Sequence, residues 1–313
     1  ALPIWTISLF RLSLNKRFNQ PLLIPMRVFL LGILCFLVGS ASSQSKVGLL
    51  LMAHGGTETW NEAVEESVAS IRADMPVSIA FGMANPVTLQ TALDDLVSQG
   101  AESVAVVRLF VSGESFLKET AYSFQLEAHA PSGHTMHEPR VLDLSVPVSL
   151  SVGGLLDAQL MAGILVDRAL GLSIDPSKES ILIVGHGPGD DDENKRWVSK
   201  MDHLAESIRK DGDFHSVNVS TLREDWTGKR EAAELELQAF VRTESTAGRT
   251  VIIIPFRLFG FGPYADVFEG LSYRADSLGL LPDQRVTDWI RSQYMSTKET
   301  LIQSEMMNHQ SHD

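Results

Sequence analysis

Two histidines occupy matching places in the sequence, each directly after an apolar run and directly before a glycine. His54 follows the apolar residues 47–53, and His186 follows a second run of the same kind. A neutral imidazole can ligate a divalent first-row metal ion or accept a proton. The glycine beside each ring would let a backbone or a flat ligand approach closely. A single histidine in such a place more often caps a strand end through a backbone hydrogen bond, but the repetition favours a functional role.

Glu114 adds a carboxylate in the first half of the chain only. It lies within residues 111–115, just after the apolar residues 104–110, and Pro263 takes its place when the two halves are aligned. His54 and Glu114 together could hold a divalent metal ion or transfer protons. By itself, Glu114 is equally well explained as a carboxylate at a helix N-terminus, where the helix dipole favours negative charge.

The segments that carry these residues predict an α/β fold built from parallel sheets. Short apolar runs with the strand signature alternate with segments of helical spacing, and this alternation is typical of a parallel sheet. Asn85 as an N-cap and Pro86 at the first helical position mark the start of one helix. The expected strands are residues 47–53, 77–81, 104–110, 141–146, 181–184, 217–222 and 251–256. The expected helices are residues 60–74, 86–98, 193–210, 229–243 and 264–277.

Three landmarks recur in the same order and indicate an internal repeat of two similar domains. Besides the strand-end His-Gly, a tryptophan is followed ten positions later by Ser-Ile-Arg, at Trp60 and again at Trp197. The tripeptide Arg-Leu-Phe occurs at residues 108–110 and 257–259. In open parallel sheets, ligands bind outside the carboxyl ends of the strands, where both histidines are expected. The expected divisions are an N-terminal domain over 46–150, a connecting helix within 151–177, a C-terminal domain over 178–280, and a C-terminal helix and tail over 281–313.

The composition limits the chemistry that these domains can carry. The 313 residues have a net charge of −13, and so acidic a chain lacks the basic surface that non-specific nucleic-acid binding requires. The single cysteine, Cys35, excludes an internal disulfide framework, an iron–sulfur cluster and a thiolate zinc site. Any bound metal ion must therefore be held by histidine and carboxylate.

Residues 1–45 differ from the rest of the chain in charge. They contain four basic residues and no acid, so the net charge of −13 becomes −17 over residues 46–313. From Met26 there follow a basic start, an apolar stretch too short to span a bilayer, and small residues, which are the three parts of a secretory signal peptide. We expect a leader over 1–43 with a cleaved signal peptide at 26–43, and a periplasmic or extracellular mature chain without a membrane span. An uncleaved N-terminal helix is the alternative.

Four segments resemble the class II chelatases of the CbiX type. They are Val-Gly-Leu-Leu-Leu-Met-Ala-His-Gly-Gly (residues 47–56), Ala-Phe-Gly-Met-Ala-Asn-Pro (80–86), Leu-Phe-Val-Ser-Gly-Glu-Ser (109–115) and the second His-Gly (186–187). The resemblance covers roughly residues 46–280. These enzymes are sirohydrochlorin cobaltochelatases and ferrochelatases, which act in tetrapyrrole and cobalamin biosynthesis. The resemblance therefore implies two chelatase-like domains, an active-site cleft between them, and insertion of Co²⁺ or Fe²⁺ into a tetrapyrrole.

The resemblance also assigns roles to single residues. His54 matches the family's histidine after the first strand. Glu114 stands where the family usually has a second histidine after the third strand, and Met83 and Ala84 stand where many members have a glutamate after the second strand.

The implied reaction sets requirements that the candidate residues can meet. Inserting a divalent metal ion into a free-base tetrapyrrole releases two pyrrole protons, so the site needs an exchangeable metal ligand and a proton acceptor. His54 is expected to be the metal ligand or the proton acceptor, with Glu114 as a second ligand or base. His186 is expected to approach the metal ion or macrocycle from the second domain. The metal ion (Co²⁺, Fe²⁺ or Ni²⁺) is a substrate, and no organic cofactor is implied.

The substrate would also need cationic partners, because sirohydrochlorin carries many carboxylates. The candidates near strand ends are Arg108, Lys118, Arg223 and Arg257. Each of these side chains is equally well explained by a surface salt bridge. The tryptophans at positions 60, 197 and 226 are expected to pack in the core or between helices.

Other functional classes fit less well, with one exception. A serine hydrolase is disfavoured because Leu117 replaces the last glycine of the nucleophile elbow that starts at Gly113, and no nucleotide-binding glycine loop is present. The alternative that remains is an exported, non-catalytic protein that binds metal or tetrapyrrole on the chelatase fold, because tetrapyrrole synthesis normally occurs in the cytosol. No sequence feature indicates an oligomeric state.

Overall fold

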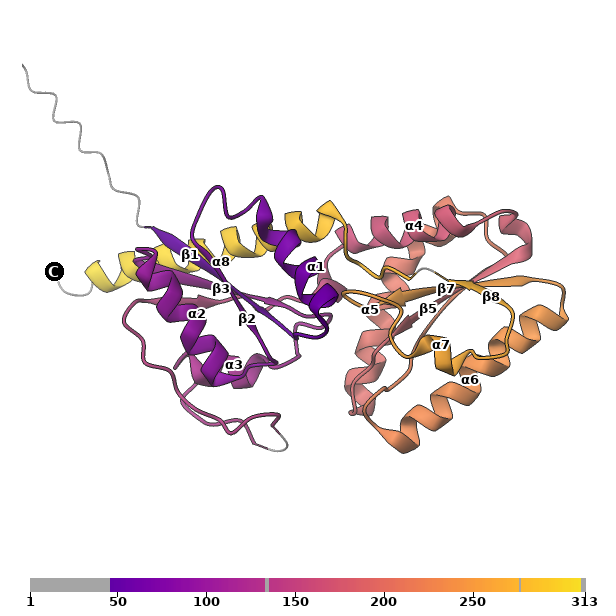
Figure 1. The fold of residues 1–313 in the computed structure, drawn as a ribbon, viewed down its shortest axis with the longest axis horizontal. Helices are drawn as coiled ribbons and strands as arrows, with labels where there is room; N and C mark the ends of the chain where they lie inside the picture. Colours follow the sequence, from indigo (N-terminus) through magenta and orange to yellow (C-terminus); the bar gives the residue numbers. More distant parts are fainter. Residues whose placement is uncertain (1–45, 133–134, 276, 311–313) are drawn as a thin grey trace, which may run out of the picture. The chain divides into compact units, whose positions relative to one another are not determined.

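The computed structural model describes residues 46–132, 135–275 and 277–310 (Figure 1). The leader over residues 1–43, with its expected signal peptide, lies outside this part of the chain. Both sheets of the structure belong to one compact unit.

The first sheet contains four parallel strands in the order β2-β1-β3-β4. Every residue of the two central strands, β1 and β3, is buried. A parallel sheet covered on both faces requires such continuous apolar runs, which is why these two strands were predicted from the sequence. The strands are β1 (Val47–Ala53), β2 (Val77–Phe81), β3 (Ser103–Leu109) and β4 (Val148–Leu150).

The second sheet has the same arrangement, with its parallel strands in the order β6-β5-β7-β8. Its central strand β5 is buried throughout. The predicted α/β class with two parallel sheets flanked by helices is confirmed. The strands are β5 (Glu179–Gly185), β6 (Ser216–Thr221), β7 (Thr250–Phe256) and β8 (Tyr273–Ala275).

Helix α2 begins at the N-cap that the sequence predicts. The Asn85 side chain accepts a hydrogen bond of 2.9 Å from the backbone N–H of Val87, and the helix runs over the predicted residues 86–98. Among the described residues, no helix is long and apolar enough to cross a membrane. The helices are α1 (Glu58–Ala69), α2 (Pro86–Ser98), α3 (Leu117–Ser123), α4 (Leu160–Leu172), α5 (Asp191–Asp211), α6 (Thr227–Thr246), α7 (Tyr264–Val267) and α8 (Gln284–Gln310), with short 3₁₀ turns at Leu155–Asp157 and Pro176–Lys178.

Helices α4 and α8 each follow one sheet in the sequence but pack on the other half of the chain. Helix α4 follows the first sheet but packs against α5 and β7, and α8 follows the second sheet but packs against β3, β4 and α1. The Tyr294 hydroxyl of α8 donates a 3.0 Å hydrogen bond to the carbonyl of Val47 in β1. The segments that looked like a connector and a C-terminal extension thus complete the helix layers of the two sheets.

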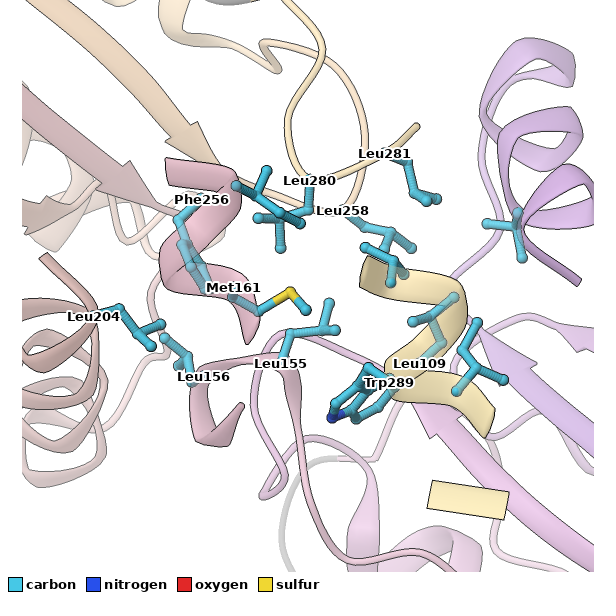
Figure 2. Packing of buried hydrophobic residues seen from close by; sticks show 14 of the residues in the cluster. Leu109, Leu155, Leu156, Met161, Leu204, Phe256, Leu258, Leu280, Leu281 and Trp289 are labelled. Atoms are coloured by element: carbon cyan, nitrogen blue, oxygen red, sulfur yellow. The ribbon is translucent and has the colours of Figure 1, made fainter. Parts of the chain in front are cut away.

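One large apolar cluster therefore contains side chains from both halves (Figure 2). Leu109 at the end of β3 and Phe256 at the end of β7 both belong to it, together with Met161 of α4 and Trp289 of α8. The carboxyl ends of β3 and β7 thus both contribute side chains to this cluster.

The predicted fourth strand over residues 141–146 is wrong. Leu142, Leu144 and Val146 alternate because this extended segment packs one face on the core beside α2, not because it pairs in the sheet. The backbone N–H of Leu142 donates to Ser123, outside the sheet. Pairing with β3 begins after Pro147, at β4.

The predicted helix over residues 264–277 is also wrong beyond its first turn. Helix α7 ends at Val267, and Gly270 adopts a left-handed backbone with φ of 72°. Residues 273–275 then form β8 and pair with β7. The helical spacing of the apolar residues was local, whereas the pairing with β7 is a long-range gain that outweighs it.

The packing of α8 predicts that Trp289→Ala will reduce the stability of the whole described unit. Trp289 is 3% exposed, and truncating a buried tryptophan costs about 3–5 kcal/mol. Urea unfolding followed by far-UV circular dichroism measures this free energy. Met295→Ala on the same helix is the control, because Met295 is 52% exposed and its loss should change stability by less than about 0.5 kcal/mol. Equal effects of the two substitutions would contradict the docking of α8.

Candidate functional site

The candidate residues lie at the carboxyl ends of the strands. His54 directly follows β1, and His186 directly follows β5. Glu114 lies in the loop between β3 and α3. These are the positions at which open parallel sheets bind ligands.

The imidazole of His54 has one nitrogen hydrogen-bonded to the backbone and one without a protein partner among the described residues. Its Nδ1 lies 2.6 Å from the carbonyl oxygen of Gly55. Because a carbonyl only accepts hydrogen bonds, Nδ1 carries the proton and Nε2 carries the lone pair. Within the described residues Nε2 has no hydrogen-bond partner, and the side chain is exposed beside the Trp60 ring, whose centroid is 6.2 Å away. His54 is therefore oriented to ligate a metal ion or to accept a proton through Nε2.

His186 has the same backbone contact but a different environment at its second nitrogen. Its Nδ1 lies 2.8 Å from the carbonyl oxygen of Gly187. Its Nε2 lies 3.1 Å from Asp225 Oδ2 and 3.9 Å from Glu224 Oε2. Unlike His54, His186 therefore has carboxylate oxygens beside its second ring nitrogen.

Glu114 forms a two-pronged ion pair with an arginine of the other half. Arg196 of α5 donates from Nε to Oε1 at 2.9 Å and from Nη2 to Oε2 at 2.5 Å. The Arg196 hydrogen bond holds the pKa of the Glu114 carboxyl below its ordinary value, against a smaller effect of burial, and the charge of Lys200 lowers the pKa further. Glu114 is thus ionised and occupied by Arg196.

The three predicted metal ligands do not form one site in this structure. No group of three or more His, Cys, Asp or Glu side chains in residues 46–132, 135–275 and 277–310 is placed to hold a metal ion. The reason is visible in the contacts, because Glu114 is paired with Arg196 and His186 with Asp225. The three residues stay a predicted ligand set, and His54 is the member whose second ring nitrogen has no protein partner among the described residues.

Arg108 has a structural role that the sequence analysis did not predict. It is 0% exposed, and its guanidinium donates to the carbonyl oxygens of Gly113 (2.8 Å), Ser115 (2.7 Å) and Ser151 (3.0 Å). Burial lowers the pKa of Arg108 to about 10. A fully buried guanidinium cannot contact a substrate, so the predicted substrate-binding role is corrected: Arg108 fixes the loop that carries Glu114.

Arg223 plays the same part for the loop that carries His186. It is 8% exposed and donates to the carbonyl of Pro188, to the carbonyl of Gly189 at 2.6 Å and to the carboxylate of Asp191 at 2.8 Å. Its Nε and Nη2 are thus engaged in holding this loop, and contact with substrate through the remaining nitrogen stays a prediction.

Of the two remaining predicted cations, one is paired and one is exposed. Arg257 donates to Glu224, which is only 10% exposed, and lies over the ring of Tyr264 at 5.8 Å. Burial disfavours the charged form of Arg257, but the charge of Glu224 raises its pKa above the ordinary value. Lys118 is exposed in the first turn of α3 and stays a predicted substrate contact.

Trp226 is more exposed than the sequence analysis expected, whereas Trp197 is buried and Trp60 is partly buried as expected. Trp226 is 39% exposed and stands edge-on to the His186 ring at 6.2 Å. It packs directly on Gly189, where an added Cβ would come within 2.2 Å of Trp226 Nε1. The glycine therefore allows an aromatic side chain to lie beside His186.

The loop after β2 has a strained backbone at Met83 and Ala84, where many class II chelatases have a glutamate. Met83 and Ala84 have φ values of 51° and 61°, in the left-handed region that non-glycine residues rarely adopt. Neither side chain can ligate a metal ion through oxygen or take up a proton. The loop after β6 instead contains Glu224 and Asp225, next to His186.

Arg196, Glu224 and Asp225 are the site residues that sequence reasoning missed. Arg196 lies on a helix face with Lys200 one turn later, a pattern that indicates only an exposed face. Its partner Glu114 is 82 residues away, and no local signal connects them. Glu224 and Asp225 could have been found from their distance behind β6, by comparison with the loop after β2.

The comparisons with known proteins bear on the fold. No family model and no curated protein matches the chain. Among solved structures, SirB from Bacillus subtilis with Fe³⁺ is similar at a TM-score of 0.58 and 16% identity, covering 82% of this chain and 98% of that one. The sirohydrochlorin chelatase SirB from Bacillus subtilis subspecies spizizenii in complex with cobalt is similar at a TM-score of 0.54 and 15% identity, covering 81% and 96%. The chain therefore has the fold of the class II chelatases, as the sequence predicted.

The Glu114–Arg196 pair predicts that Arg196→Gln will raise the pKa of Glu114 toward its ordinary value. The depressed pKa means that the pair persists at neutral pH and is lost as the pH falls through that pKa. Carbon-detected NMR titration of the glutamate carboxyl groups measures the shift. Lys200→Gln is the matched control and should raise the pKa less, because Lys200 acts only through its charge. Identical titration of Glu114 in both variants would contradict the pairing.

Proposed function

Because the described residues have the fold of the sirohydrochlorin chelatases, we propose that this protein inserts a divalent metal ion, Co²⁺ or Fe²⁺, into a tetrapyrrole such as sirohydrochlorin. The observation that carries the proposal is the orientation of His54 at the end of β1. Its Nδ1 is fixed by the Gly55 carbonyl, and its Nε2 is open to the surroundings. The SirB neighbours, described with iron and with cobalt, support a metal-handling role for such a fold.

His54 meets the first requirement of the reaction. A metal ion that is to be transferred must be held by few protein ligands and released quickly, so a single exposed imidazole suits the task better than a closed cage. The same nitrogen can instead accept one of the pyrrole protons, since a neutral imidazole is a base near neutral pH. The metal ion is in either case a substrate, and the proposal requires no organic cofactor.

Glu114 assists as a second ligand or proton acceptor once it leaves Arg196. Its loop is held in place by the buried Arg108, whose donors bind the carbonyls of Gly113 and Ser115. The carboxylate can therefore change partner without movement of the loop. His186, with Asp225 and Glu224 beside it, approaches the metal ion or the macrocycle from the second half.

A second candidate function is an exported protein that binds metal or tetrapyrrole without turnover. The feature that favours it is the expected leader, because tetrapyrrole synthesis normally occurs in the cytosol. We propose export in either case, from the basic and apolar leader before residue 44.

The proposal predicts that the purified protein accelerates metal insertion into sirohydrochlorin, followed by absorbance with Co²⁺, Fe²⁺ and Ni²⁺ against a protein-free control. His54→Ala should abolish the activity, a loss of about a hundredfold or more, because the open nitrogen is removed. Glu114→Ala should weaken it by about tenfold. His203→Ala is the matched control, since His203 is an exposed histidine on α5, and it should leave the rate unchanged.

The outcomes separate the two candidate functions. Acceleration with none of the three metals would contradict the chelatase proposal. Tight binding of metal or tetrapyrrole without turnover would favour the second candidate. Wild-type rates in both His54→Ala and Glu114→Ala would contradict the assignment of these residues.

A further inference from the structure

We propose that Arg196 binds a carboxylate of the anionic macrocycle, and that Glu114 occupies this place only while the ligand is absent. The inference rests on the proposed function, because it takes a polycarboxylate tetrapyrrole as the ligand. It adds a specificity-determining residue that lies on helix α5, whereas the cations predicted from the sequence lie near strand ends.

The geometry of the pair is that of a carboxylate-binding site. Two donors of Arg196, Nε and Nη2, face the two oxygens of Glu114 at 2.9 and 2.5 Å. This parallel arrangement fits any carboxylate, whether it belongs to the protein or to a ligand. Glu114 thus has the position and shape that a ligand carboxylate would take.

The pair is exposed enough to exchange. The side chains of Arg196 and Glu114 are 51% and 40% exposed, and an ion pair at that exposure contributes little net stability. A ligand that presents several carboxylates at once can therefore displace Glu114 at small cost. A buried pair would leave an uncompensated charge behind, but both of these groups reach water.

The other arginines near the candidate residues are not free to make this exchange. Arg108 and Arg223 give their donors to backbone carbonyls of the loops that they support. Arg257 is paired with Glu224, which is only 10% exposed. Their release would break buried hydrogen bonds, whereas the release of Arg196 breaks only the contact with Glu114.

The exchange also prepares Glu114 for the metal ion. Once it leaves Arg196, the solvent-exposed carboxylate is available to bind an arriving divalent metal ion. Because Arg108 holds the loop on both sides of Glu114, the carboxylate stays at the site after it is displaced. Binding of the macrocycle and availability of Glu114 are thereby coupled.

The experiment compares ligand binding by the full chain, without metal ion, for two free-base rings of similar size. One is sirohydrochlorin, which carries many carboxylates, and the other is a water-soluble porphyrin with cationic substituents and no carboxylate. Absorbance or fluorescence titration gives the dissociation constant for each. For sirohydrochlorin, Arg196→Gln should weaken binding about tenfold. Arg196→Lys should weaken it less, since lysine keeps the positive charge but lacks the two parallel N–H donors of the guanidinium.

Glu114→Gln should strengthen the binding of sirohydrochlorin about threefold, because it removes the competing carboxylate. For the cationic porphyrin, Arg196→Gln should not weaken binding. Lys200→Gln is the matched control on the same helix. Lys200 is paired with Asp157 at 2.7 Å, and its loss should change the dissociation constant for sirohydrochlorin by less than about twofold.

Each outcome bears on the inference. If wild type and Arg196→Gln bind sirohydrochlorin equally, the inference is wrong and the proposed function stands. If Lys200→Gln weakens the binding of sirohydrochlorin as much as Arg196→Gln does, a general effect of charge explains the loss and the inference is wrong. If Arg196→Gln weakens the binding of the cationic porphyrin as much as that of sirohydrochlorin, a structural effect explains the loss and the inference is also wrong. If the wild-type chain binds neither ring, the proposed function fails and the inference fails with it.

Discussion

The apolar cluster that both halves share is the constraint on which the rest of the structure depends. Leu109 ends β3 and Phe256 ends β7, and both belong to this cluster together with side chains of α4 and α8 (Figure 2). Helix α4 follows the first sheet in the sequence but packs on the second half, and α8 follows the second sheet but packs on the first half. Separating the halves would expose this surface, at about 25 cal/mol per Å² of apolar area. This shared cluster therefore holds the two halves of the described chain together.

Two buried arginines fix the conformations of the loops that carry Glu114 and His186. Arg108 holds the carbonyls around Glu114, and Arg223 holds those beyond His186. A buried guanidinium is tolerated only when its donors are satisfied, so these contacts specify the loop conformations strongly. The cations that looked most suited to a substrate thus shape the loops that carry the candidate residues, and an exposed arginine on a neighbouring helix pairs with Glu114.

The two halves have the same strand order but different environments at their histidines. The ring of His54 has an open Nε2, whereas that of His186 faces Asp225. The difference comes from the loops after β2 and β6, because only the second supplies carboxylates. Strand order is set by the apolar pattern of the whole half, and a loop can change its residues without affecting that pattern. A common fold therefore does not imply a common site.

The sequence by itself determined the features that depend on neighbouring residues. The buried central strands, the Asn85 cap of α2 and the places of His54 and His186 behind strands all follow from periodicity and capping, which act over a few positions. Only the tertiary structure determined where the fourth strands β4 and β8 lie, on which half of the chain α4 and α8 pack, and which charged groups pair with each other. Glu114 meets Arg196 across 82 residues of sequence, and Arg108 is buried because segments far apart close over it. Such contacts depend on how distant elements pack, which no local pattern encodes.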